Sequence, residues 1–290
     1  MNNFEWHHRF ADPVAERLSP YFSRLFVILG QHSLQFAILN SETNMFVALS
    51  DLRLKTNLKG PILYAEHLRQ LFLEEGLLQK PYSSVTIGVE TPVHTLVPSA
   101  MFDRDHMKHY LRFHFRLPEE HPLFCEHIPE VDAYNIHSID PAILAVIHQF
   151  FPEAATMHPG TSLVRSCYQD YRLNQRSVCL FLHVREPDID LCCIGENGLL
   201  FFNSFTYHSK EDLLYFTLYA MDQLKLHVED TTVNISGFLE KDTDAYALLS
   251  QYIPQLSFTT RPGPAVYSPV LHSLPGHFYQ PLFGLALCGS

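Results

Sequence analysis

The feature that most constrains the fold of this chain is an internal repeat. Three predicted strands, a helix, a strand, a helix and a strand occur twice in the same order, displaced by about 150 residues. The positions that match are the hairpin tips Thr43-Asn44 and Asn197-Gly198, the helix starts Pro61 and Glu211, and the strands around Val85 and Thr232. Any mixed domain alternates strands and helices to some degree, so chance recurrence is the alternative. A shared order at one offset favours two similar α/β units.

Hydrophobic periodicity supplies the individual elements. Leu34, Phe36 and Ile38 alternate with less apolar residues, as in a half-buried strand, before a turn-forming polar segment. In the second half, Ser209 is a good N-cap for a helix that is predicted to reach about residue 228. The strands and helices that match between the halves are predicted at 25–29, 33–39, 45–49, 61–76 and 84–89, and at 178–184, 189–194, 199–205, 209–228 and 232–236.

The repeat divides the 290 residues into two units of similar size. We predict a first unit over residues 1–172, with an N-terminal extension and an insertion at about 133–151 that the second half lacks. The second unit is predicted over residues 173–290. Phe4, Trp6 and Phe10 of the extension are expected to fold back onto the protein. Each unit is long enough to bury a core of its own.

Charge and hydropathy limit the partners. The 31 acidic residues exceed the 20 lysines and arginines, giving a net charge of −11, so nucleic acid is not an expected partner. No stretch approaches the roughly 18 consecutive apolar residues that a membrane-spanning helix needs. The polar N-terminus has no apolar core of a secretory signal. We therefore expect a cytoplasmic protein without a membrane span.

The 18 histidines and six cysteines invite a search for a metal site. No Cys-x-x-Cys pair occurs, which removes the usual zinc and redox patterns. His106 and His109 share a helical face, but the basic residues around them indicate a solvated surface. The doublet His7-His8 is expected in a frayed terminus. We predict no metal site; a metal hydrolase built on the histidines remains a minor alternative, which metal content tests.

Three segments resemble a known family. They are Val85-Thr86-Ile87-Gly88-Val89-Glu90, Thr95-Leu96-Val97-Pro98-Ser99-Ala100-Met101-Phe102, and the tail from His277 to Cys288. The chain resembles an uncharacterised bacterial protein family of about this length with an actin-like ATPase fold. More distantly, it is similar to the actin-like proteins of type IV pilus assembly. The resemblance implies a mixed α/β fold of two tandem ribonuclease-H-like subdomains, and a nucleotide site between them.

An actin-like ATPase needs glycine-rich turns for the phosphates, an aspartate that organises Mg²⁺, and a glycine pair near the adenosine. Here the first turn, Leu29-Gly30-Gln31-His32-Ser33, lacks the aspartate. The second turn, residues 183–188, has no glycine and contains Pro187, which removes one N–H donor. Near the adenosine, Gly237 stands alone before the bulky Phe238, which we expect to fill the cleft. A nucleotide, if bound, would use Gly30, Ser33, Asp188 and Gly237.

Other catalytic patterns are missing too. The sequence contains no phosphate-binding Gly-x-x-x-x-Gly-Lys-Ser/Thr or Gly-x-Gly-x-x-Gly and no Gly-x-Ser-x-Gly nucleophile turn. Asp188 and Asp190 share a strand face and are interpreted as solvated edge charges. A ribonuclease-H-type nuclease needs several acids that converge at strand ends, and only Asp51 and Glu90 occupy even loosely suitable places. We predict no catalytic residues.

The hypothesis from the sequence is a non-catalytic actin-like protein, with no cofactor. It would act as an interaction scaffold for an unidentified protein partner. The alternative is a divergent ATP-binding protein or ATPase that holds Mg·ATP in the cleft between the two halves.

Overall fold

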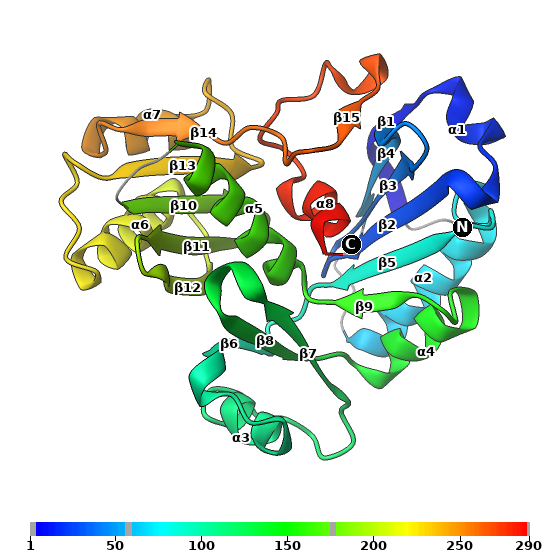
Figure 1. Ribbon diagram of the computed structural model, residues 1–290, viewed down its shortest axis with the longest axis horizontal. Helices are drawn as coiled ribbons and strands as arrows, with labels where there is room; N and C mark the ends of the chain where they lie inside the picture. The colour runs from blue at the N-terminus through cyan, green and yellow to red at the C-terminus, as the bar shows by residue number, and fades with distance from the viewer. Residues whose placement is uncertain (1–3, 56–59, 175–177, 289–290) are drawn as a thin grey trace.

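The computed structural model describes residues 4–55, 60–174 and 178–288. Two large sheets lie on opposite sides of the molecule, and a small third sheet lies beside the junction between them (Figure 1). The mixed α/β fold predicted from the sequence is confirmed. Among the described residues, no helix combines the length and the apolar character needed to cross a membrane.

The first large sheet has seven strands in the order β1-β4-β3-β2-β5-β9, with β15 also paired to β4. Strands β2, β3 and β4 form the predicted antiparallel meander, and β5 and β9 run parallel to β2. The bounds are β1 (Phe4–Ala11), β2 (Ser23–Leu29), β3 (Ser33–Asn40), β4 (Met45–Leu54), β5 (Ser84–Val89), β9 (Ala155–Met157) and β15 (Val266–Tyr267).

Alternation along β2 gives this sheet two apolar faces. Leu25 and Val27 point into a core with helices α2 (Pro61–Glu74) and α4 (Pro141–Phe150). Phe26 and Ile28 point to the other face, where helix α8 (Gln280–Gly284) packs. A strand buried on both faces reads as a continuous apolar run, which explains the sequence of β2.

The second large sheet has the order β12-β11-β10-β13-β14. The bounds are β10 (Val178–Val184), β11 (Asp188–Gly195), β12 (Gly198–Thr206), β13 (Thr232–Gly237) and β14 (Leu256–Phe258). One face packs against α6 (Lys210–Gln223) and α7 (Asp244–Tyr252), and the other against α5 (Pro159–Asn174), which links the sheets. The order β11-β10-β13-β14 matches β3-β2-β5-β9 of the first sheet, as the repeat predicted.

The third sheet lies between β5 and α4 in the chain. It contains β6 (His94–Pro98), β7 (Leu123–Ile128) and β8 (Ala133–Ser138) in the antiparallel order β6-β8-β7, with helix α3 (Met107–Arg112) beside it. The segment without a counterpart in the second half is therefore 94–138. The insertion expected at 133–151 overlaps it only at β8, since α4 packs on α2 as α7 packs on α6. Periodicity alone does not reveal which helix covers the main sheet.

Both ends of the chain return to the first sheet. The N-terminal segment, expected to be frayed, forms β1 on β4, and Phe4 is buried, so the extension folds back as expected. A short helix, α1 (Pro13–Arg17), follows it. From the second half, β15 pairs with β4, and α8 packs on β2, β3 and α5. The division of the chain at residue 172 stays a prediction; it falls inside α5.

Candidate functional site

The turn after β2 contributes glycine and neutral groups to the junction between the large sheets. The amide of Gly30 donates to the carbonyl of Ser33, 2.9 Å away, so the hairpin itself uses this donor. A Cβ added to Gly30 would lie 2.6 Å from Ser33 Oγ and 2.9 Å from Glu90 Oε2. Gly30, Ser33 and Glu90 therefore meet where β2 and β5 end.

The matching turn after β10 is built around Arg185. Its Nε and Nη2 donate to the two carboxylate oxygens of Asp190, at 3.0 and 3.1 Å, and its Nη1 donates to Asp188 Oδ2 at 3.0 Å. Hydroxyls of β12 complete the set, since Ser204 donates to Asp190 Oδ1 and Thr206 donates to Asp188 Oδ1. The two aspartates are buried, so their interpretation as solvated edge charges is wrong. The sequence signal that was missed is the arginine at the turn, three and five residues before them.

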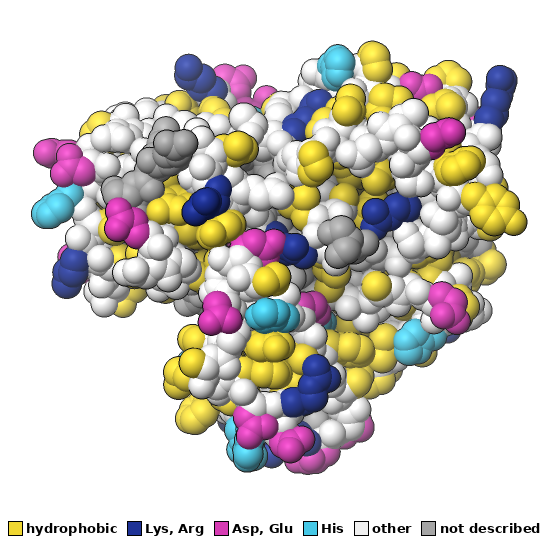
Figure 2. All heavy atoms as spheres, viewed as in Figure 1, with side chains coloured by type: hydrophobic (Ala, Val, Ile, Leu, Met, Phe, Trp, Pro, Cys, Tyr) yellow, Lys and Arg dark blue, Asp and Glu magenta, His cyan; other side chains and the backbone are white. Residues whose placement is uncertain are grey.

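Glu90 connects the two turns. Its Oε2 lies 3.9 Å from Arg185 Nη1, so the carboxylate at the end of β5 faces the guanidinium at the end of β10. Figure 2 shows one face of the molecule, on which acidic, basic and histidine side chains lie among hydrophobic ones, whereas the side chains of this cluster are mostly buried. The two halves therefore meet through a charged cluster of one cation and three carboxyl groups.

Burial and pairing control the charges in this cluster. Burial raises the pKa of Asp190, but the charge and hydrogen bonds of Arg185 outweigh this and leave the pKa at about 2. Burial lowers the pKa of Arg185, whereas Asp190 and Glu90 raise it by a larger amount. The pKa of Glu90 is raised, mainly by burial. Arg185 and Asp190 are thus both ionised near neutral pH, as a two-bond ion pair.

Gly237 ends β13 next to the same junction. Its φ of +81° is a left-handed value, and a Cβ there would lie 2.0 Å from the carbonyl oxygen of Val184. The following Phe238 packs against Phe278 and Tyr279, with centroid distances of 5.3 Å, and under the guanidinium of Arg53 at 4.8 Å. Phe238 therefore packs on Arg53 of the first sheet and on two aromatic residues of the C-terminal segment, whereas other residues line the cavity at the junction, so filling of the cleft by Phe238 stays a prediction.

A cavity of about 810 Å³ opens beside the charged cluster, between the small sheet and β12. Consecutive residues of β12, from Leu199 to Ser204, line it, so the edge of this strand borders the cavity. Residues of β6 line the opposite side, including His94 and Thr95. Arg185 lies at its wall. The cavity therefore opens at the junction between the halves, next to the charged cluster.

Three histidines lie on the β6 side of this cavity: His94 and His158 line it, and His137 is fully buried beside them. His94 and His137 are paired across β6 and β8, and His94 stacks on His158 with centroids 4.0 Å apart. Burial lowers the pKa of His94 to about 4 and of His137 to about 3, and it raises the pKa of Glu126 to about 8. These groups are therefore uncharged near neutral pH. These residues could not be grouped from the sequence, because strand pairing unites residues that are far apart in the chain.

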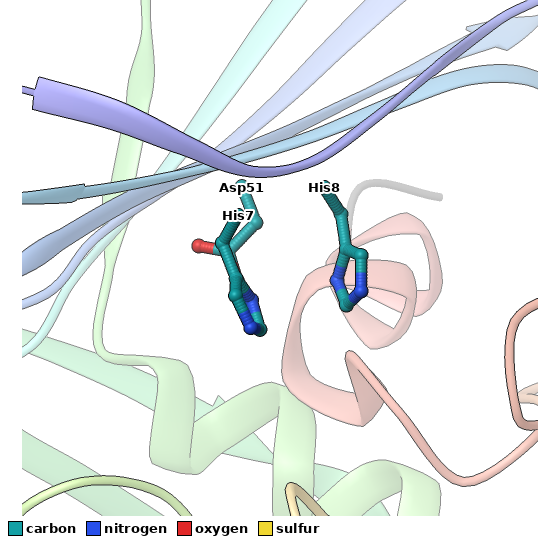
Figure 3. Close-up of side chains that lie close together, drawn as sticks. All are labelled: His7, His8 and Asp51. Carbon is teal, nitrogen blue, oxygen red and sulfur yellow. The ribbon is translucent and has the colours of Figure 1, made fainter.

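A second polar cluster contains His7, His8 and Asp51 (Figure 3). Ligand atoms of the three side chains lie within 4.8 Å of one another. The sequence placed the doublet in a frayed terminus, whereas it belongs to β1. The other histidine pair, His106 and His109, is exposed, and His106 is bonded to Asp103.

One protein family and several solved structures match this chain. Residues 16–256 match the model of the family described as protein of unknown function DUF3822. No curated protein matches the chain.

Two solved structures carry the comparison of folds. One is a Bacteroides thetaiotaomicron protein with an actin-like ATPase fold and unknown function, 21% identical, with a TM-score of 0.73 over 83% of this chain and 91% of that one. The other is the PilM–PilN complex of type IV pilus biogenesis, 14% identical, with a TM-score of 0.57 over 92% and 98%. At sequence identities this low, the similarity establishes the fold and not the function. The chain therefore belongs to the DUF3822 family of unknown function and has the actin-like ATPase fold.

Proposed function

We propose that this protein is a non-catalytic actin-like protein that acts by binding a protein partner, and that its own side chains take the place of a nucleotide. The observation that carries the proposal is the Arg185 cluster. Its guanidinium is held by Asp188 and Asp190 at the turn that would face the phosphates. The cluster also bridges the two halves through Glu90.

The charge of this cluster opposes a bound triphosphate. Three carboxyl groups surround one guanidinium, and a polyphosphate would add further negative charge at short range. The carboxylate oxygens of Asp190 already accept bonds from Arg185 and Ser204, so binding Mg²⁺ would require breaking a buried ion pair. These residues do not fit Mg·ATP.

The residues proposed for a divergent nucleotide site are brought into one region but are already engaged. The Gly30 amide is bonded to Ser33, and Asp188 to Arg185 and Thr206. The amide of Gly237 donates to the carbonyl of His277, 2.9 Å away. A nucleotide would have to displace each of these bonds, which supports the scaffold over the ATPase alternative.

A partner would find its most accessible surface at the cavity between β6 and β12. PilM, whose fold is similar, is described in complex with PilN. In this chain, β12 is the outer strand of its sheet and β6 is the outer strand of the small sheet. Such strands present backbone donors and acceptors to a bound segment. The partner itself remains unidentified.

Nucleotide binding separates the two readings. At a ligand concentration 100 times the dissociation constant, binding stabilises a folded protein by about 2.7 kcal/mol, which raises Tm by several degrees. We expect millimolar Mg·ATP or Mg·ADP to leave Tm unchanged and calorimetric titration to show no binding. Micromolar binding, lost in the Asp188→Asn chain, would establish the divergent ATP-binding alternative instead.

Site-specific photo-crosslinking in cells that produce the protein tests the partner surface. A crosslinker in place of Leu200, 46% exposed on β12, should trap one defined protein. The matched control is Tyr252, 55% exposed on α7, and it should trap none above background. If the crosslinker traps the same proteins in equal amounts at both positions, the cavity between β6 and β12 is not the partner surface.

A further inference from the structure

The cluster of His7, His8 and Asp51 has no role in the proposed function. It lies on the inner side of β1 and β4, facing α8 (Figure 3). His7 is the most exposed member, with 46% of its side chain accessible, whereas the side chain of Asp51 is fully buried. The cluster is therefore reachable from solvent through one histidine and anchored by one carboxylate.

A β-bulge puts the two histidines together. Neighbouring side chains of a regular strand point to opposite faces. In β1, however, Trp6 pairs with Leu52 and His8 pairs with Asp51, so His7 is an extra residue in the register. A bulge of this kind re-aims a side chain. The His7 imidazole contacts the carboxylate of Asp51 directly, and the His8 imidazole is linked to it through the hydroxyl of Tyr279. The bulge therefore places the side chains of two consecutive histidines on the same side of the strand.

Only one of the two carboxylate oxygens of Asp51 has hydrogen-bond partners among the described residues. Its Oδ2 lies 3.2 Å from His7 Nδ1 and 3.0 Å from the hydroxyl of Tyr279, and it accepts from Arg53. Its Oδ1 is buried and has no hydrogen-bond partner within the described parts of the chain. Leaving a buried carboxylate oxygen unpaired is costly, and this cost points to a ligand for the carboxylate.

We propose that His7, His8 and Asp51 bind one divalent transition-metal ion of the zinc class. Two imidazole nitrogens and one carboxylate suit zinc, and water supplies a fourth ligand in an open site. Ligand atoms around one tetrahedral zinc lie about 3.3 Å apart. His7 Nδ1 already lies within that spacing of the carboxylate, 3.2 Å from Oδ2, and the unpaired Oδ1 is the oxygen that remains for the ion.

Surrounding groups prepare the ligands. His8 Nδ1 lies 2.5 Å from the hydroxyl of Tyr279, which donates to Asp51, so His8 Nδ1 is the donor and Nε2 keeps its lone pair. Arg53 opposes the ion by its charge, but it also stacks on Phe238 and keeps that contact if it releases Asp51.

Titration of the full chain with Zn²⁺ tests the site, using chelator-treated protein without a histidine tag. We expect one ion per chain with a dissociation constant on the order of 1 μM. Co²⁺ should give the absorption spectrum of a tetrahedral nitrogen- and oxygen-ligated ion. His7→Ala should weaken binding at least about tenfold. His106→Ala, in the exposed pair on the other side of the molecule, should change nothing.

Two further variants separate a metal site from a hydrogen-bond network. Arg53→Gln removes a positive charge next to the ion, so it should bind zinc more tightly than the natural chain. His8→Ala should abolish the tetrahedral cobalt spectrum, and a melting curve shows that this chain folds. The proposal is overturned if the natural chain binds no Zn²⁺ at 100 times the expected constant, or if His7→Ala and His8→Ala bind as it does. It does not depend on the absence of nucleotide binding.

Discussion

The two turns that face each other across the junction come from equivalent places in the repeat but have opposite character. After β2 the turn contains Gly30 and an exposed Gln31, and the amide of Gly30 donates to the carbonyl of Ser33 within the turn. After β10 the turn contains Arg185, which holds two buried aspartates. The apolar alternation that builds the sheets is the same in both halves. The two halves thus share the order of their strands, whereas their surfaces at the junction differ.

Replacing Arg185 is the strongest test of this contrast. Arg185→Leu leaves Asp188 and Asp190 buried without a cation, and it should lower the free energy of unfolding by about 3–5 kcal/mol. Gln31→Ala in the facing turn is exposed and should cost less than about 0.5 kcal/mol. Urea unfolding at neutral pH measures both.

A second change sharpens the Arg185 result. The chain with both Arg185→Leu and Asp190→Asn should recover part of the lost stability, because one unpaired charge is gone. No recovery would mean that the arginine acts through packing and not through its charge.

Glycine gives the second comparison. Gly237→Ala puts a Cβ 2.0 Å from a backbone carbonyl oxygen at φ +81°, and it should lower the free energy of unfolding by about 2 kcal/mol or more. Gly30→Ala meets only the side chains of Ser33 and Glu90, which can turn aside, so its cost should stay below about 1 kcal/mol. Thermal unfolding of both variants measures the difference. Equal losses would show that the first turn is as tightly constrained as the second.

The repeat could be predicted from the sequence because it rests on local patterns. Alternation in β2 and β3, the N-cap Ser209 and the hairpin at Asn197-Gly198 each act within a few residues. Long-range pairing leaves no such signal. Phe4 lies near the start of the chain and Val266 near its end, yet both belong to strands that pair with β4. No residue near either position indicates this pairing. The same limit misplaced the insertion, because the packing of α4 on α2 is a long-range contact that the sequence of α4 alone does not reveal.

The candidate site was predictable in its parts and not in its connections. Gly30, Ser33 and Asp188 were named from their turns, and the structure brings them into one region. The partners that engage them come from other strands, as Thr206 and Glu90 do. The convergence of His7 with His8 depends on a bulge, which is a property of register and cannot be read from one strand alone.

The small sheet has no equivalent in the second half, and it should give the protein a distinct pH response. Glu126 has a pKa of about 8 in the folded chain, raised by burial from its ordinary 4.5. Between these values the folded state keeps a proton that the unfolded state releases, so stability falls as pH rises. Across this window the natural chain should lose about 1–3 kcal/mol relative to Glu126→Gln. Urea unfolding at several pH values measures the difference.

A histidine of the same sheet, His94, should make stability depend on pH in the acidic range. Burial lowers the pKa of His94 to about 4, so the folded state resists the proton that the unfolded state accepts below about pH 6.5. Stability from this group is present above pH 6.5 and is lost as pH falls toward 4. Glu120→Gln, on an exposed loop of the same insertion, is the control and should leave the pH profile unchanged. A shifted profile in that control would contradict the assignment to Glu126 and His94.

The smallest expected difference concerns how the first long helix of each half begins. In α6, Ser209 Oγ accepts from the amide of Asp212, and the carboxylate of Asp212 accepts from the amide of Ser209. In α2 the N-cap is Gly60, which has no side chain to cap, and Pro61 follows it at the first helical position. Of these two helices, only α6 therefore has a side-chain cap.

Ser209→Ala should lower the free energy of unfolding by about 1 kcal/mol, whereas Gly60→Ser, at φ +97°, should give no gain from capping. The amide of His208 is the main cause that lowers the pKa of Asp212, so the capping interaction should persist in mild acid and weaken only once that carboxylate is protonated. Chemical unfolding near neutral pH and again in strong acid measures this change. A cost for Ser209→Ala that does not diminish in acid would mean that the serine hydroxyl caps α6 without help from Asp212. The two halves would then differ by a single hydrogen bond at this position, not by a reciprocal pair.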